Sequence, residues 1–175
     1  VALSAGFHAV MRDVSSEAVK RGEKRIAGDL ERRVEKGKLS GEEKESILAR
    51  LQTATRLEDL AECDVVIEAA TENIALKKEI FQTLDRVTRK EAILASNTSS
   101  ISITRIASFT GRPEKVVGMH FFNPAPVMKL IELIRGMATS EATFQTAKDL
   151  AVKMGKTPLE AKDFPGFISS RLIFS

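Results

Sequence analysis

Two ionisable side chains in apolar surroundings are the first candidates for chemistry. His120 lies at the end of the apolar run 115–122, and Glu132 lies inside the otherwise apolar run 128–134. A carboxylate buried in such a run needs a partner. An imidazole suits it, because the carboxylate can fix the ring tautomer and stabilise the imidazolium. The two residues therefore predict a general acid/base at His120 steadied by Glu132, with a purely structural histidine as the alternative.

A third candidate, Asp13, ends the predicted strand 7–13. In α/β folds an acidic residue at this place accepts hydrogen bonds from the adenosine ribose hydroxyls of NAD, and it would repel the 2′-phosphate of NADP. A turn aspartate that caps the next helix is the alternative. The glycine-rich turn G-x-G-x-x-G, expected about 20 residues earlier, is absent, and the chain begins at Val1 rather than Met. We therefore expect further sequence to precede Val1.

Short polar side chains also cluster in the segment 96–100, directly after a predicted strand. Ligands of open α/β sheets bind beyond the carboxyl ends of strands, which places this segment and His120 at the same edge. Ser99 or Ser100 can also cap the helical segment that follows. The second histidine, His8, lies inside its predicted strand and is expected to be structural.

The elements that must position these residues alternate between strands and helices along the chain. Residues 1–6 are typical of the last turn of a helix closed by Gly6, and Ser40 with Glu43 predicts a capping box. Strands are expected at 7–13, 53–55, 63–70, 92–97, 115–122, 128–134 and 157–161, and helices at 15–37, 40–51, 57–63, 73–88, 101–109 and 142–155. The central strands are apolar without a polar alternate face, as in a parallel sheet covered on both sides. The prediction is a doubly wound α/β fold with a mostly parallel, Rossmann-like sheet that lacks its first strand and glycine-rich turn.

Composition argues against several classes of function. The 175 residues, 43% hydrophobic and 29% charged, suit one soluble domain. No apolar run reaches the roughly 18 residues that span a bilayer, and the sequence predicts no secretory signal. The single cysteine, Cys63, fits a reducing compartment, and no Cys/His cluster predicts a metal site. The net charge of +3 comes from basic residues interleaved with acidic ones, which is typical of solvated helices and argues against nucleic-acid binding.

Four segments carry a resemblance to a known family: 68–73 (EAATEN), 97–100 (NTSS), 118–128 (GMHFFNPAPVM) and 163–167 (DFPGF). In this order they closely resemble the L-3-hydroxyacyl-CoA dehydrogenase family, including 3-hydroxybutyryl-CoA dehydrogenases, over essentially the whole chain. The stretch 120–132 is the most specific. The resemblance implies an enzyme that interconverts 3-hydroxyacyl-CoA and 3-oxoacyl-CoA with NAD, and it implies no metal.

The resemblance also implies a role for each matching residue. His120 would take the proton from the substrate's 3-hydroxyl while a hydride passes from C3 to the nicotinamide ring, and Glu132 would steady the charged imidazole. Ser99 and Asn123 would hydrogen-bond the substrate oxygen and the nicotinamide side of the cofactor. Further contacts to the cofactor would come from Asp13, Glu72 and Lys77. Contacts to coenzyme A would come from Ser99 and Lys36.

Two positions qualify this resemblance. Lys36 lies on a charged helical segment, so a solvated lysine is the alternative to a coenzyme A contact. Ser170 stands where the family commonly has Asn, and a hydroxyl offers one donor where an amide offers two.

The resemblance divides the chain into an NAD-binding domain at 1–168, incomplete at its N-terminus, and the start of a helical dimerisation domain at 169–175. It implies a cytoplasmic homodimer that acts on acyl-CoA without nucleic-acid or membrane partners, with the mitochondrial matrix as the alternative location. Two other functions stay open: a dehydrogenase of another small hydroxy acid on the same fold, and a non-catalytic binding module or fragment. Kinetics with acyl-CoA against such acids distinguish the first of these.

Overall fold

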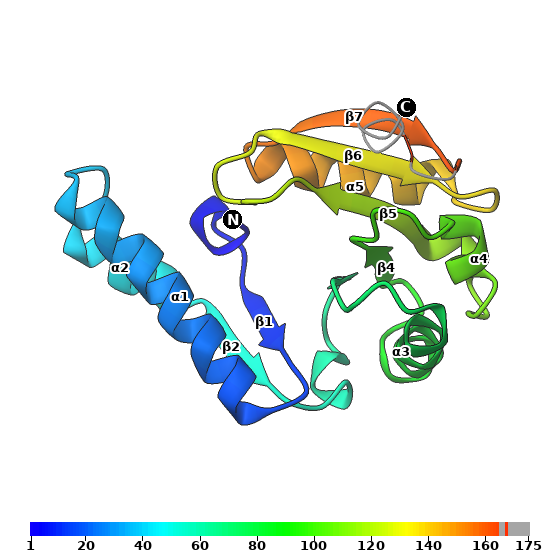
Figure 1. Cartoon of the computed structure of the whole chain (residues 1–175), viewed down its shortest axis with the longest axis horizontal. Coiled ribbons are helices and arrows are strands. Elements are labelled where there is room, and N and C mark those ends of the chain that lie inside the picture. Colours follow the sequence, from blue (N-terminus) through cyan, green and yellow to red (C-terminus); the bar gives the residue numbers. More distant parts are fainter. Residues whose placement is uncertain (165–166, 168–175) are drawn as a thin grey trace. The chain divides into compact units, whose positions relative to one another are not determined.

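The computed structural model describes residues 1–164 and 167, and the chain divides into two compact units, Val1–Asp59 and Leu60–Ser175 (Figure 1). The first unit joins two parallel strands to a pair of helices. Its elements are a 3₁₀ turn (Leu3–Ala5), β1 (Ala9–Arg12), α1 (Ser16–Glu35), α2 (Gly41–Leu48) and β2 (Leu51–Ala54). Strands β1 and β2 pair in parallel, and a small apolar core of Leu3, Leu30 and Ile47 holds the unit together.

Local sequence explains where the helices of this unit begin. The Ser15 hydroxyl accepts a hydrogen bond from the amide of Ala18 at 3.2 Å and starts α1. The predicted capping box is present at the start of α2, where Ser40 and Glu43 each bond the other's backbone amide. Such caps satisfy amides that have no partner inside the helix.

The structure corrects three details in this unit. Residues 3–5 form a 3₁₀ turn rather than the end of an α-helix, although Gly6 closes it as predicted. His8 precedes β1 and is exposed, so the prediction of a structural histidine inside a strand is wrong. Strand β2 covers Leu51–Ala54 instead of 53–55, because it follows β1 residue by residue from Ala9 opposite Leu51.

The second unit is a five-stranded sheet in the order β3-β4-β5-β6-β7. Its elements are β3 (Val65–Glu68), α3 (Ile74–Val87), β4 (Ile93–Ser96), α4 (Ile103–Ala107), a 3₁₀ turn (Pro113–Lys115), β5 (Val116–Phe121), β6 (Leu130–Arg135), α5 (Glu141–Lys153) and β7 (Thr157–Lys162). A 3₁₀ turn (Glu58–Leu60) replaces the predicted helix 57–63. The doubly wound, mostly parallel α/β fold predicted from the sequence is confirmed.

One strand pair departs from a parallel arrangement. Strands β5 and β6 run antiparallel, while every other pair in the described sheets is parallel. Only residues 122–129 separate these two strands. Parallel neighbours need a crossover of a dozen or more residues, so the short connection forces the chain to turn back on itself.

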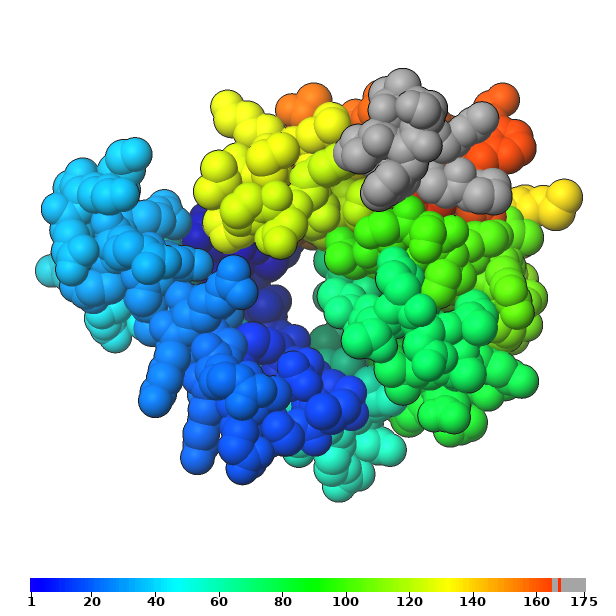
Figure 2. All heavy atoms as spheres, in the orientation of Figure 1, coloured from blue at the N-terminus to red at the C-terminus, as the bar shows by residue number. Residues whose placement is uncertain are grey.

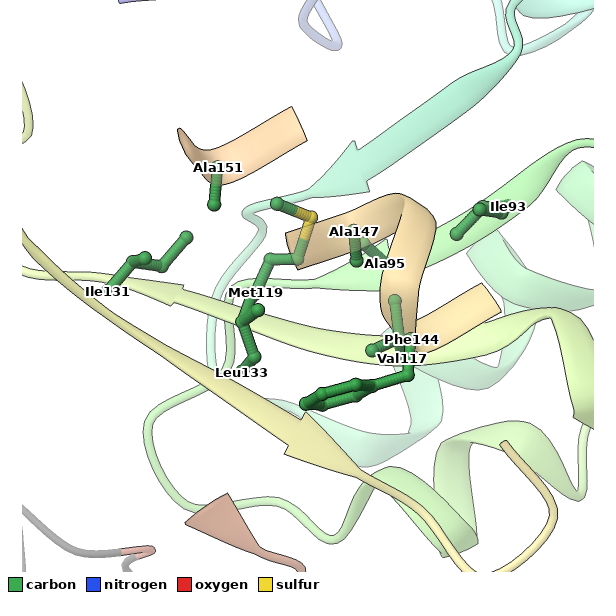
Figure 3. Packing of buried hydrophobic residues seen from close by; sticks show 9 residues of the cluster. All are labelled: Ile93, Ala95, Val117, Met119, Ile131, Leu133, Phe144, Ala147 and Ala151. Carbon is green, nitrogen blue, oxygen red and sulfur yellow. The ribbon is translucent and has the colours of Figure 1, made fainter. Parts of the chain in front are cut away.

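The alternation of side chains along β5 and β6 separates a packing face from a chemical face. Val117, Met119, Ile131 and Leu133 pack in one cluster with Phe144, Ala147 and Ala151 of α5 (Figure 3). Successive residues of a strand point to opposite faces. His120 and Glu132 therefore project from the face away from α5. Across the described residues, no helix has the length and apolarity needed to cross a bilayer.

Candidate active site

His120 and Glu132 are register partners across the antiparallel pair of β5 and β6. Because directly opposite residues project from the same face, the fold brings the two side chains together. His120 Nδ1 lies 2.8 Å from Glu132 Oε2. Glu132 is fully buried and His120 is 9% exposed. The carboxylate inside the apolar run thus meets an imidazole, which is the partner that its burial requires.

The second ring nitrogen of His120 meets Ser99. Ser99 Oγ lies 3.2 Å from His120 Nε2. With Nδ1–H donated to the Glu132 carboxylate, Nε2 carries the lone pair and accepts from the Ser99 hydroxyl. This tautomer follows from the hydrogen-bond network. It makes Nε2 the atom of the ring that can take up a proton.

His120 opens into a pocket of about 370 Å³, within the size range of small-molecule sites. The pocket is lined by Asn97, Ser99, His120, Phe121, Phe122, Asn123 and Ala125. The rings of Phe122 and Phe167 lie with their centroids 5.1 and 6.2 Å from that of His120. Among the described residues, no three His, Cys, Asp or Glu side chains gather as metal ligands.

Two asparagines shape the mouth of this pocket. Asn97 Oδ1 accepts a hydrogen bond from the amide of Phe121 at 2.8 Å, which ties the end of β4 to the end of β5. Asn123 is exposed and lies in the turn between β5 and β6. The stretch of chain around residues 122–129, yellow-green to yellow by the colour bar, reaches the surface in the space-filling view (Figure 2). The resemblance implies a role for Asn123, whereas Asn97 was expected only as one of the polar residues 96–100 at this edge. Its own contact is to a backbone group 24 residues away, which leaves no local pattern.

Glu72 braces the segment that carries Ser99. Its carboxylate accepts from the Thr98 hydroxyl at 2.8 and 2.9 Å and from the Ser99 amide at 2.6 Å. Charge-assisted bonds of this kind are the stronger ones in proteins. The Glu72 side chain keeps 41% of its surface exposed, so it can also face a ligand.

Lys77 lies in the core of the second unit. Its ammonium donates to Glu68 Oε1 and Oε2 at 2.7 and 2.9 Å, and the side chain is fully buried. The Ser96 hydroxyl and the Ala70 amide also donate to Glu68, and Glu72 Oε2 lies 3.9 Å from Lys77 Nζ. The sequence offers a signal for Glu68, because an acid ends the apolar strand, but the prediction did not use it.

The N-cap of α4 is neither Ser99 nor Ser100. Ser102 is the N-cap, and Asp163 accepts from the Ser102 hydroxyl and the amides of Ile103 and Thr104, each at 2.8 Å. The prediction of Ser99 or Ser100 as the cap is therefore wrong. The physical reason is that Thr98 Oγ1 takes up the amides of residues 100 and 101 and delays the helix.

Two predicted contact residues belong to the first unit. Asp13 directly follows β1, is exposed, and accepts from the amide of Val14 at 2.7 Å. Lys36 is the C-cap of α1 and is exposed. Ser170 lies outside the described residues.

Comparison with known proteins agrees with this geometry. Residues 1–164 match the family described as 3-hydroxyacyl-CoA dehydrogenase, NAD binding domain. A probable 3-hydroxybutyryl-CoA dehydrogenase from Bacillus subtilis is 52% identical over 172 residues, which cover 98% of this chain and 60% of that protein. A 3-hydroxyadipyl-CoA dehydrogenase from Escherichia coli is 44% identical, over 98% of this chain and 36% of that protein.

Solved structures give the same result. The crystal structure of (S)-3-hydroxybutyryl-CoA dehydrogenase from Ralstonia eutropha matches with a TM-score of 0.95 at 45% identity, over 98% of this chain and 60% of that chain. The chain thus spans about 60% of the length of the 3-hydroxybutyryl-CoA dehydrogenases that it matches. Since the family match covers almost all of the described residues, the chain belongs to the 3-hydroxyacyl-CoA dehydrogenase family, in its NAD-binding domain.

Proposed function

We propose that the protein is an oxidoreductase that interconverts 3-hydroxyacyl-CoA and 3-oxoacyl-CoA with NAD, and that His120 is its general acid/base. The observation that carries this proposal is the imidazole held between Glu132 and Ser99 at the mouth of a pocket. A neutral ring with one fixed nitrogen and one nitrogen toward ligand space has the arrangement that proton transfer needs.

The residues present fit a bound NAD. Asp13 offers an exposed carboxylate at the carboxyl end of a parallel strand, which suits the hydroxyls of a ribose. Ser99, Asn123 and Glu72 offer polar groups at the strand ends of the second unit and would lie on the nicotinamide side. Lys77, whose ammonium is buried against Glu68, would act on the cofactor through Glu72 rather than by direct contact.

In the oxidation direction His120 Nε2 accepts the proton of the substrate's 3-hydroxyl. NAD, when bound, supplies the acceptor for the hydride that leaves C3. The imidazole becomes charged in this step, and the buried Glu132 carboxylate stabilises that charge. Glu132 also keeps Nδ1 protonated, so the ring cannot present the wrong nitrogen. In the reverse direction the charged His120 returns the proton to the carbonyl oxygen.

Ser99 and Asn123 would orient the reacting oxygen. The Ser99 hydroxyl already occupies the hydrogen-bonding direction of His120 Nε2, so a substrate hydroxyl would share or replace this bond. Asn123 lines the same pocket and offers both a donor and an acceptor. Two groups on one oxygen would fix its distance from the ring, which is how positioning lowers a barrier.

Several relatives are named 3-hydroxybutyryl-CoA dehydrogenases, and we propose a short 3-hydroxyacyl-CoA as the substrate here. Lys36 and Ser99 would contact the coenzyme A substrate, Lys36 because an exposed ammonium suits its phosphates. We further propose that residues 1–168 form the NAD-binding domain and that residues 169–175 begin a helical dimerisation domain. The protein would work as a cytoplasmic homodimer in fatty acid β-oxidation. It would have no nucleic-acid or membrane partners.

The test is turnover of acetoacetyl-CoA with NADH by the full-length protein. His120→Ala should lower kcat by roughly 10²- to 10⁴-fold, the usual contribution of a general acid/base, while NADH titration shows binding retained. His8→Ala is the matched control, because His8 is exposed and belongs to the other unit.

Undiminished turnover in the His120 variant would refute the assignment of the base. Faster reaction with a free small hydroxy acid than with the acyl-CoA would instead favour a different substrate on the same fold. Absence of NADH binding by the wild-type protein would point to a non-catalytic module.

A further inference from the structure

Lys156 is a buried cation that does not line the pocket of His120. It follows Gly155, which lies two residues after the end of α5 at Lys153. The positive φ of Gly155, 73°, turns the chain toward β7. Left-handed backbone of this kind is easily adopted only by glycine. The turn brings Lys156 under the connection between β5 and β6, where it is 8% exposed. Its ammonium donates to the backbone carbonyls of Ala125 and, at 2.8 Å, of Met128.

The ammonium of Lys156 has no ion-pair partner among residues 1–164 and 167. Its environment is therefore made of carbonyl dipoles, and burial lowers the pKa of Lys156 below its ordinary value. A buried charge without a counter-charge opposes folding unless its hydrogen bonds compensate. An apolar residue would fill this place at less cost to stability, so the bonds to the turn are the feature that distinguishes a lysine here.

The turn that Lys156 contacts has few other hydrogen bonds among the described residues. Within residues 123–128, the backbone bonds run from the amides of Val127 and Met128 to the carbonyl of Pro124, at 2.9 and 3.0 Å. In the described part of the chain, Lys156 provides the side-chain hydrogen bonds to this turn. The outer side of the turn faces solvent, with Val127 73% exposed. Asn123 stands at its start, at the pocket.

We propose that Lys156 is a positioning residue that anchors the turn 123–128 through two of its carbonyls and so holds Asn123 toward the pocket. The part of this inference that concerns catalysis rests on the role proposed for Asn123; the anchoring does not. Lys156 itself is not among the residues that line the pocket. Its effect passes through the backbone of the turn, because Ala125 both lines the pocket and accepts from the ammonium.

The experiment compares three variants of the full-length protein. Lys156→Met keeps the length of the side chain and removes every donor, Lys156→Arg keeps charge and donors, and Lys153→Met makes the same change on the exposed last turn of α5. Hydrogen exchange of the Val127 and Met128 amides reports on the turn, and melting reports on the fold. Turnover of acetoacetyl-CoA and titration with NADH report on the site.

In Lys156→Met we expect exchange at these two amides to rise roughly 10- to 100-fold, the effect of losing charge-assisted bonds. We expect kcat/KM to fall about 10-fold, the fold to survive, and Lys156→Arg to recover most of both losses. Lys153→Met should match the wild type. Unchanged exchange in Lys156→Met would overturn the anchoring, and so would an equal rise in Lys153→Met.

The two proposals fail in distinguishable ways. A wild-type protein that does not reduce acetoacetyl-CoA refutes the proposed function, and the exchange data still decide the anchoring. A fall in kcat/KM of Lys156→Met without faster exchange at the turn would overturn the positioning role. If Lys156→Met unfolds, Lys156→Arg alone decides. Amide exchange and turnover at wild-type levels in Lys156→Arg support the anchor. Unprotected exchange of the Val127 and Met128 amides in Lys156→Arg contradicts it.

Discussion

Removal of the charge on Glu132 isolates the electrostatic part of the proposed mechanism. Glu132→Gln keeps the size and shape of a fully buried side chain, and its amide oxygen can still accept from His120 Nδ1–H. The variant therefore preserves the hydrogen bond and the ring tautomer while removing the negative charge. The neutral ring of the resting enzyme loses little, but the charged ring that forms during the reaction loses its counter-charge.

The magnitude follows from the geometry. With Nδ1 and Oε2 at 2.8 Å, the centres of the two charges lie ~4 Å apart, which gives about 4 kcal/mol of attraction at an effective dielectric constant of about 20. The amide dipole returns roughly 1 kcal/mol as a neutral hydrogen bond. The net loss is about 2–3 kcal/mol once the ring is charged, which corresponds to a fall in kcat of roughly 30- to 150-fold.

Steady-state kinetics of the full-length protein with 3-hydroxybutyryl-CoA and NAD measure this fall, because the ring becomes charged in the oxidation direction. KM and the Kd of NADH should stay within about 2-fold of the wild type, because a side chain with no exposed surface touches neither ligand. Glu160→Gln is the control: Glu160 lies on the neighbouring strand, is exposed and pairs with Arg135, and a surface pair of this kind contributes about 0–1 kcal/mol. Wild-type kcat in Glu132→Gln, or a loss confined to KM, would refute the reasoning.

Two further predictions concern buried groups. Lys77→Met should destabilise the fold by about 3–5 kcal/mol, because it leaves the buried Glu68 carboxylate without its cation. Adding Glu68→Leu should recover most of that loss. Urea unfolding measures the stability of both variants, and equal stability of the single and the double variant would contradict the prediction. Burial and the neighbouring Asp64 carboxylate raise the pKa of the Cys63 thiol, so its thiolate fraction at pH 8 is small. Iodoacetamide should therefore alkylate Cys63 more slowly than free cysteine at that pH and gain speed as pH rises, and an equal rate for both thiols would show the expectation to be wrong.

The sequence was most informative where a residue broke the pattern around it. Glu132 interrupts an apolar run, so its burial could be inferred, and burial required a partner such as His120. The same logic applied to Glu68 would have found the partner Lys77, since an acid also ends that apolar strand. The direction of β6 could likewise have been inferred, because residues 122–129 are too few for a crossover.

Other parts of the site depend on tertiary contacts that leave no local pattern. Asp163 accepts from an amide at the start of a helix 60 residues earlier in the chain, which no window around residue 102 reveals. Asn97 and Lys156 bind backbone groups, and every residue type offers a carbonyl, and every type except proline an amide, to such a partner. The residue type at the partner position therefore does not predict either contact.

The antiparallel pairing of β5 and β6 has a consequence for how this site can be altered. The facing of His120 and Glu132 is a property of strand register, and a shift by one residue would send one of the two to the face of α5. Gly118 helps to fix that register, because a Cβ there would lie 2.7 Å from Cβ of its partner Ile134. The turn between the strands is a separate module. Substitutions at residues 124–129 can therefore alter the rim of the pocket near Ala125, while the facing of His120 and Glu132 is set by the sheet.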